Sequence, residues 1–393
     1  MADNGDLFEV SDQAENLSDI ENFDPKIVSQ AVVSGTDWTT ETIISQINKG
    51  NIQLNPRFQR RDAWERERKS QFIESLILGL PIPQLVLAES KTKRGSYIVI
   101  DGKQRLLSIR QFAAEPDDKI YQRLQLTGLN IRDDLRKLSL FDLRADAARS
   151  DDLAAFENQP IRTIVIKNWG NDNFLYQVFL RLNTGSVPLS PQELRQALHP
   201  GDFVEFADLA SGESKALRDL LKLKKPDFRM RDAELLIRWY AFQYFGDRYN
   251  GDLKGFLDHT CAELNSWWPQ SQNEIIGKLE DFEAAYSCAR DIFGDNVCRK
   301  WTSDGYERPF NRAIFDFIMY YFAMPNVRER AIPQKEAVEL AFRRLCETNA
   351  DFLGSIERTT KSIGATSLRF SIWAEELGAV LGIALRSPVL RVG

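Results

Sequence analysis

The chain has 393 residues, of which 43% are apolar and 27% charged, and its formal net charge at pH 7 is −6. This length exceeds the usual size of one domain, and the apolar fraction is large enough to form real cores. No apolar run reaches the roughly 18 residues of a membrane span, and the N-terminus lacks the basic and hydrophobic regions of a signal peptide. We therefore expect a cytoplasmic protein of two domains, preceded by a tail and with no membrane partner.

Histidine and cysteine are too scarce for several classes of site. The two histidines, His199 and His259, lie in no catalytic or metal-binding motif, and the four cysteines contain no Cys-x-x-Cys pair. A His-Asn-His nuclease, a zinc hydrolase and a Ser-His-Asp hydrolase all need histidines within such motifs. The sequence predicts no zinc or other protein-bound metal cluster and no disulfide framework, and nuclease activity is not expected of this chain.

Charge is distributed unevenly along the chain. The first 25 residues contain eight acidic residues and no Lys or Arg, which predicts a disordered acidic tail over residues 1–25. Residues 55–110 contain twelve Lys or Arg and six Asp or Glu. Local positive charge of this kind favours an anionic ligand, either a nucleotide or a nucleic acid.

The first elements after the tail are short. Thr39, Thr40 and Glu41 followed by isoleucines predict a capped helix that ends at Gly50. The segment NPRFQRRDAW, residues 55–64, then places Arg57, Gln59 and Arg60 among two aromatic rings. Arginine forks match phosphate geometry and aromatic rings can stack on a base, but a surface turn with its rings in the core stays an open alternative.

A helix over residues 65–78, stopped by Gly79, leads to a strand at residues 85–87 and a polar turn that returns into a second strand at residues 97–100. The chain then breaks at Asp101 and Gly102 and continues as a helix from Lys103. Asp101 is expected at or near the helix N-cap, and Gly102 leaves the turn without a side chain. Free backbone N–H groups at such a helix start form a natural seat for an anion.

The two cations of this turn strengthen the anion interpretation. Lys103 and Arg105 lie in the first helical turn, where the helix dipole disfavours positive charge by about 0.3–1 kcal/mol each. A bound phosphate reverses the sign of that cost. In the alternative, which stays open, Asp101 caps the helix and Arg105 pairs with it.

Further along, residues 163–166 predict a strand and residues 173–182 an amphipathic helix that ends near Arg181 and Asn183, two donors beside a turn. Ser190, Pro191 and Glu193 have the spacing of a capping box with proline at the first helical position, so a helix is expected through Leu198. Beyond residue 200 only helical patterns recur, at residues 233–245, 274–293, 311–322, 335–346 and 368–381.

Five blocks occur in a distinctive order: NPRFQRRDAW, FIESLILGLPIPQLVL, YIVIDGKQRLLSI, FLRLNTGSVPLSPQELR and RMRDAELLIRWYAF. In this order they resemble the N-terminal domain of the GmrSD-type modification-dependent restriction systems, a family similar in fold to the ParB and sulfiredoxin group. The resemblance implies an α+β protein: a ParB/sulfiredoxin-like mixed α/β domain over residues 26–200, followed by an all-helical domain over residues 201–393.

The resemblance also implies a nucleotide site in an anti-phage defence system. The family's Asp-Gly-Gln-Gln-Arg motif falls on Asp101, Gly102, Gln104 and Arg105, with Lys103 in place of the first glutamine. Phe58 replaces the tyrosine of the family's Tyr-Gln-Arg segment, so a role that needs the phenol does not carry over. Members often carry or pair with a His-Asn-His nuclease, for which this chain has too few histidines, so a separate subunit is expected to supply cleavage.

Three hypotheses follow. In the first, the protein is a sensor or regulatory subunit that binds a nucleoside triphosphate with Mg²⁺, and hydrolysis by Asp101 and Arg105 stays open. In the second, it is a non-catalytic DNA-binding adaptor that uses the basic residues between 57 and 110. The third, a nuclease acting through carboxylates alone, lacks a compact Asp/Glu/Lys constellation. The nucleotide-binding candidates of the first hypothesis are Gly102, Lys103, Gln104, Arg57, Gln59, Arg60, Arg181 and Asn183. The oligomeric state stays open.

Overall fold

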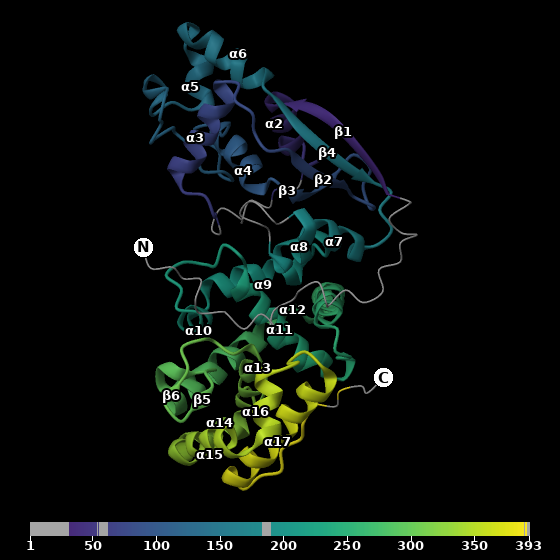
Figure 1. Ribbon diagram of the computed structural model, residues 1–393, viewed down its shortest axis with the longest axis vertical. Helices are drawn as coiled ribbons and strands as arrows, with labels where there is room; N and C mark the ends of the chain where they lie inside the picture. The colour runs from purple at the N-terminus through teal and green to yellow at the C-terminus, as the bar shows by residue number, and fades with distance from the viewer. Residues whose placement is uncertain (1–30, 53, 55–61, 183–189, 389, 391–393) are drawn as a thin grey trace. The chain divides into compact units, whose positions relative to one another are not determined.

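The computed structural model describes residues 31–52, 54, 62–182, 190–388 and 390 (Figure 1). The chain divides into two compact units, one over residues 22–198 and one that contains residues 199–393, and each is described by itself. The predicted acidic tail lies outside the described residues.

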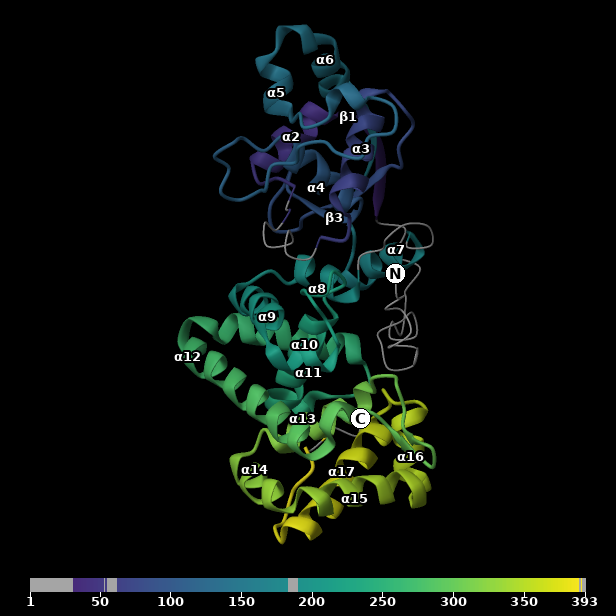
Figure 2. The ribbon, with the colours of Figure 1, turned by 90° about the vertical axis from the view of Figure 1, so that its left-hand side faces the viewer.

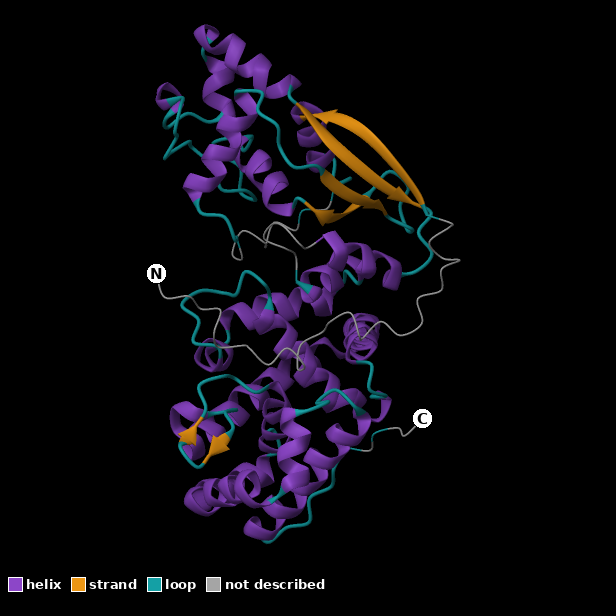
Figure 3. Ribbon diagram, in the orientation of Figure 1, coloured by secondary structure: helices purple, strands orange, loops and turns teal. Residues whose placement is uncertain are grey.

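A four-stranded sheet forms the centre of the first unit. Its strands are β1 (Val32–Thr39), β2 (Leu85–Glu89), β3 (Tyr97–Asp101) and β4 (Pro160–Lys167), in the order β1-β4-β2-β3. β2 and β3 form the predicted antiparallel hairpin, β4 pairs parallel with β2, and β1 pairs antiparallel with β4 along its whole length. The two long strands β1 and β4 lie side by side in Figure 3. The sequence patterns did not predict β1.

Helices pack on the sheet of this unit through one apolar core. They are α2 (Thr40–Asn48), α3 (Arg66–Ile77), α4 (Lys103–Phe112) and α6 (Ser150–Asn158). The core joins these helices to the sheet through side chains such as Ile43, Ile73, Leu85, Val99, Leu106, Phe112 and Phe156. α5 (Leu140–Ala145) lies beside α6 at one end of the unit (Figure 2). Thr39 caps α2 by accepting a hydrogen bond from the Thr42 backbone N–H, as predicted.

A buried carboxylate holds the long connection after α4 in place. Glu74 on α3 is 3% exposed, and it accepts hydrogen bonds from the backbone N–H groups of Asn130 (3.2 Å), Ile131 (2.9 Å) and Arg132 (2.7 Å). Burial raises the pKa of Glu74, but the three N–H donors outweigh it and leave that pKa below its usual value. This side chain therefore fixes the loop that leads into the short 3-10 helix η5 (Asp133–Leu135).

The unit ends with two helices, α7 (Asp172–Leu182) and α8 (Pro191–Leu198). The predicted capping box is confirmed at the start of α8: the Glu193 N–H donates to Ser190 Oγ at 3.1 Å, and the Ser190 N–H donates to Glu193 Oε2 at 2.7 Å. Both helices contact β3. They therefore lie next to the strand that leads into the predicted anion site.

The second unit is helical. Its larger elements are α9 (Asp202–Glu213), α10 (Lys215–Leu220), α11 (Arg231–Phe245), α12 (Leu253–Phe293), α13 (Arg312–Phe322), α14 (Pro325–Ala331), α15 (Lys335–Thr348), α16 (Ala350–Glu357) and α17 (Ile363–Leu381). In its core, Asp316 is fully buried between Arg238 (2.5 and 2.6 Å) and Arg369 (3.0 Å). The aromatic residues of α11, such as Trp239, Tyr240 and Phe242, are buried in this core, as expected.

Two expectations about this unit need correction. It is not purely helical, because β5 (Trp301–Thr302) and β6 (Gly305–Tyr306) form a short hairpin, drawn in orange in Figure 3. The helix predicted from residue 274 begins at Leu253 and runs through Pro269 without a break. The α+β class with a helical C-terminal region is confirmed. None of the helices in the described part of the chain is long and apolar enough to cross a membrane.

Candidate functional site

The turn between β3 and α4 is built on one glycine. β3 ends at Asp101, Gly102 is the N-cap residue with φ +100°, and α4 begins at Lys103. A Cβ at position 102 would collide with the Leu85 side chain of β2 and lie 3.1 Å from Arg105 Nη2. Both the backbone conformation and the close packing therefore require glycine here.

The start of α4 has no side-chain cap. Gly102 offers no capping oxygen, and the first turn contains no acidic residue. The expectation that Asp101 caps the helix is therefore wrong: Asp101 is the last residue of β3, and its carboxylate turns to Arg105 instead. The first backbone N–H groups of α4 remain a site at which the helix dipole favours negative charge.

Arg105 lies over this turn and is only partly satisfied. Its side chain is buried, and Nη2 donates to Asp101 Oδ2 at 2.8 Å. Its Nε is buried without a hydrogen-bond partner among the described residues. The carboxylate of Asp101 is more accessible, with 27% of the side chain exposed. Arg105 thus keeps one buried donor for which the described part of the fold offers no acceptor.

Lys103 makes a second ion pair at the turn. Its Nζ donates to Glu193 Oε1 on α8, and both side chains are buried, at 7% and 6% exposure. The same glutamate closes the capping box of α8 with its other oxygen. The local sequence pattern predicts only the capping-box role of Glu193, because it does not show a contact across 90 residues.

These two ion pairs correct the expectation that the cations at the start of α4 need a bound anion. Lys103 and Arg105 do crowd the positive pole of α4, but Asp101 and Glu193 already balance their charges. Their position at the helix start therefore does not by itself require a bound anion. The alternative in which Arg105 pairs with Asp101 is confirmed in that respect.

Of the other candidates within the described residues, Gln104 lies in the first turn of α4 and Arg181 lies on α7. Gln104 is half-buried, and its Oε1 has no partner in the described part of the chain. Arg181 is exposed in the last turn of α7, and no hydrogen bond or ion pair described joins it to the turn. Four predicted positions lie outside the described residues, namely Arg57, Gln59, Arg60 and Asn183.

The described cations of the basic run, residues 62–110, are divided between buried ion pairs and exposed positions. Four of its cations are buried or largely buried and paired with carboxylates, namely Lys69, Lys103, Arg105 and Arg110. The cations of the run that the structure describes as exposed are Arg66, Arg68, Lys91, Lys93 and Arg94. The local charge counted from the sequence is therefore larger than the number of exposed, unpaired positive charges on described residues that could contact DNA phosphates.

The described residues on either side of residues 55–61 are held near α4. Leu54 accepts a hydrogen bond through its carbonyl from Tyr121 Oη at 2.7 Å, and Tyr121 packs in a small core with Leu107 of α4. Asp62 pairs with Lys69, whose Nζ also donates to Gln111 Oε1 on α4 at 2.7 Å. Burial lowers the pKa of Lys69 to about 8, whereas the adjacent carboxylate favours the charged form.

Comparison with protein families identifies this unit. Residues 40–200 match the family model described as "GmrSD restriction endonuclease, N-terminal domain". Residues 40–200 belong to this family. The match contains the whole β2–β3 hairpin, the turn at Gly102, α4 and the Glu193 capping box. Searches of curated proteins and of solved structures gave no match.

The family match covers residues 40–200 and implies a general role for this domain. A GmrSD N-terminal domain is a component of restriction systems. Its presence at residues 40–200 implies that the protein is involved in a phage-restriction system. The block at residues 229–242 lies outside the matched residues, so its resemblance stays a prediction. Within the described ranges, no three His, Cys, Asp or Glu side chains are grouped as metal ligands.

Proposed function

We propose that the GmrSD N-terminal domain of this protein binds a nucleoside triphosphate at the turn between β3 and α4. The phosphates lie at the uncapped N-terminus of α4, where backbone N–H groups and the helix dipole favour anions. The observation that carries the proposal is the Gly102 N-cap, which leaves this helix start without a side chain inside the matched family domain.

Arg105 and Lys103 supply positive charge in this proposal, Arg105 by gaining a second partner and Lys103 by exchanging one. Arg105 Nε, which has no described acceptor, donates to a phosphate oxygen while Nη2 stays on Asp101. Lys103 reaches the phosphates when it leaves Glu193, and Glu193 retains its hydrogen bond to the Ser190 N–H. Gln104, half-buried beside them, orients the ligand with its amide.

The residues of the turn fit a triphosphate with Mg²⁺, because Mg²⁺ is commonly held by one or two carboxylates together with the phosphates themselves. Asp101 offers such a carboxylate with part of its surface exposed. Mg²⁺, when bound, neutralises phosphate charge. Hydrolysis, if it accompanies binding, requires mainly positioning and charge stabilisation, which Arg105 and the helix start provide.

We further propose that this domain acts on DNA together with a separate nuclease subunit. The 393 residues contain only two histidines, neither in such a motif, which supports placing a His-Asn-His centre on a partner subunit. The described exposed cations, such as Arg66, Arg68 and Arg94, leave a modest basic surface for DNA. We therefore assign DNA contact to the assembled system and nucleotide binding to this chain.

The test is a titration of the purified full-length protein with each of the four nucleoside triphosphates plus Mg²⁺, with and without duplex DNA. Calorimetry reports binding and a phosphate assay reports turnover. Arg105→Gln is expected to weaken binding at least about tenfold, because a hydrogen bond to a charged group is worth about 1.5–3 kcal/mol.

Arg94→Gln is the matched control. It removes the same charge from the exposed turn at the other end of β3 and should leave nucleotide affinity unchanged. Circular dichroism and thermal unfolding of both variants verify that the fold is intact. Equal affinities for the wild-type protein, Arg105→Gln and Arg94→Gln would refute the proposed site.

A further inference from the structure

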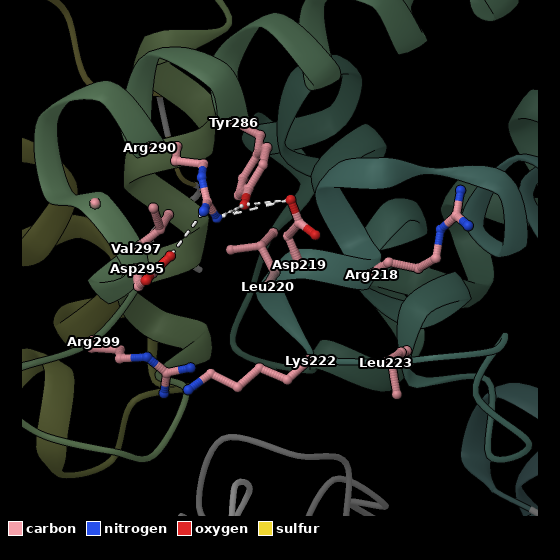
Figure 4. A pocket seen from close by; sticks show the side chains of 11 residues that line it. Arg218, Asp219, Leu220, Lys222, Leu223, Tyr286, Arg290, Asp295, Val297 and Arg299 are labelled. Atoms are coloured by element: carbon pink, nitrogen blue, oxygen red, sulfur yellow. Dashed lines mark hydrogen bonds and ion pairs between the residues drawn. The ribbon is translucent and has the colours of Figure 1, made fainter.

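A cavity of about 370 Å³ opens in the helical unit, between the loop that follows α10 and the C-terminal end of α12 (Figure 4). Its lining contains four cations, Arg218, Lys222, Arg290 and Arg299, and two acids, Asp219 and Asp295. The cavity therefore carries a net positive charge in a chain whose own net charge is −6. No part of this cavity belongs to the family domain described above.

Both acidic side chains that line the cavity form ion pairs with the same cation, Arg290. Arg290 Nη2 lies 2.9 Å from Asp295 Oδ1, and Arg290 Nη1 lies 3.8 Å from Asp219 Oδ2. Tyr286 completes the cluster, because its Oη accepts from Arg290 Nη1 at 3.0 Å and donates to Asp219 Oδ2 at 3.2 Å. The dashed lines of Figure 4 mark these contacts. Asp219 and Asp295 therefore neutralise Arg290 rather than the remaining cations.

Arg218 is directed away from this cluster in Figure 4. Its guanidinium donates to two backbone carbonyls, those of Glu213 at 2.7 Å and Ser214 at 3.3 Å. These bonds hold it along α10, so Arg218 contributes long-range potential but no contact at the centre of the cavity.

Lys222 and Arg299 remain, and their charged ends point toward each other across the cavity (Figure 4). Arg299 is only 4% exposed, and the one described hydrogen bond of its side chain goes from Nη1 to the Arg308 carbonyl. Within the described ranges, neither side chain forms an ion pair with a carboxylate. Burial also lowers the pKa of the Arg299 guanidinium, as expected for a charge without an acidic partner.

A buried guanidinium facing an ammonium is unfavourable unless an anion lies between them. We propose that Lys222 and Arg299 bind the phosphate of a phosphomonoester in this cavity. Two cations match the charge of a phosphomonoester dianion, and arginine binds phosphate oxygens in a forked geometry. The apolar side chains of Leu223 and Val297 and the volume of the cavity leave room for an organic part the size of a nucleoside.

The experiment titrates the full-length protein by calorimetry with inorganic phosphate, adenosine 5′-monophosphate and adenosine. We expect saturable binding of at least one phosphate-bearing probe and none of adenosine. Lys222→Gln should weaken phosphate binding about tenfold or more, because it removes one of the two charged donors that contact the phosphate. Lys222 is exposed, so the substitution should leave the fold intact. Tighter binding of the nucleotide than of phosphate would identify a nucleotide-sized ligand, whereas equal binding would identify the phosphate group alone.

Lys224→Gln is the matched control, since Lys224 is an exposed lysine of the same loop that does not line the cavity. Arg105→Gln separates this site from the proposed triphosphate site, because it should leave the monophosphate affinity at Lys222 unchanged. The proposal is overturned if neither phosphate probe binds at millimolar concentration. It is equally overturned if Lys222→Gln and Lys224→Gln bind the probes alike.

Discussion

Replacing Gly102 by alanine tests how the turn before α4 is held. Gly102 has φ +100°, a conformation that costs a residue with a side chain about 1–2 kcal/mol. The new methyl group would also collide with the side chain of Leu85, which is fully buried in β2. Such overpacking costs about 1–3 kcal/mol. The two terms together predict that Gly102→Ala destabilises the first unit by about 2–5 kcal/mol.

Gly50→Ala provides a matched control in the same unit. Gly50 also has a positive φ, +70°, but no described atom lies within 4 Å of the position a Cβ would occupy. Gly50→Ala should therefore lower the stability of the unit only by the conformational term of about 1–2 kcal/mol. The difference between the two variants isolates the steric term at Gly102.

Hydrogen exchange followed by mass spectrometry is the suitable assay, because the chain contains two units that need not unfold together. Peptides that cover β2 and β4 report the opening of the first unit separately from the helical unit. Exchange protection in these strands should fall clearly further for Gly102→Ala than for Gly50→Ala. Equal losses in the two variants would refute the argument that close packing, and not only backbone conformation, requires glycine at position 102.

Two further predictions concern buried carboxylates. Lys103→Met should destabilise the first unit by about 3–5 kcal/mol, because it leaves Glu193 buried without its cation. Lys103→Met combined with Glu193→Leu should cost less than the sum of the two single changes. Additive effects on the free energy of unfolding in urea would contradict the pairing. The lowered pKa of Glu74 means that its contribution is present above the ordinary carboxyl pKa of about 4.3 and is lost as the pH falls through the lowered value. Glu74→Gln should therefore destabilise the unit at pH 7 by about 1–3 kcal/mol and flatten the acid limb of its stability profile, and an unchanged profile from thermal unfolding at pH 3–7 would contradict this.

The family and the main elements could be predicted from the sequence because their signals are local. The hairpin, the glycine turn and the capping box at Ser190 each depend on residues within a few positions of one another, and the structure confirms all three. β1 escaped prediction because its residues Val32 to Thr39 mix apolar residues, glycine and polar residues without a buried face, and pairing with β4 makes the strand.

By itself, the sequence determined that a strand turns into a helix through Gly102 and that two cations lie at that helix start, since backbone preference and helical spacing act over a few residues. Only the tertiary structure decided what those cations contact. Glu193 reaches Lys103 from 90 residues away because α8 packs near β3, and Asp101 turns from the cap to Arg105. Charge balance at a buried site depends on which side chains the fold brings together, and local sequence does not encode that.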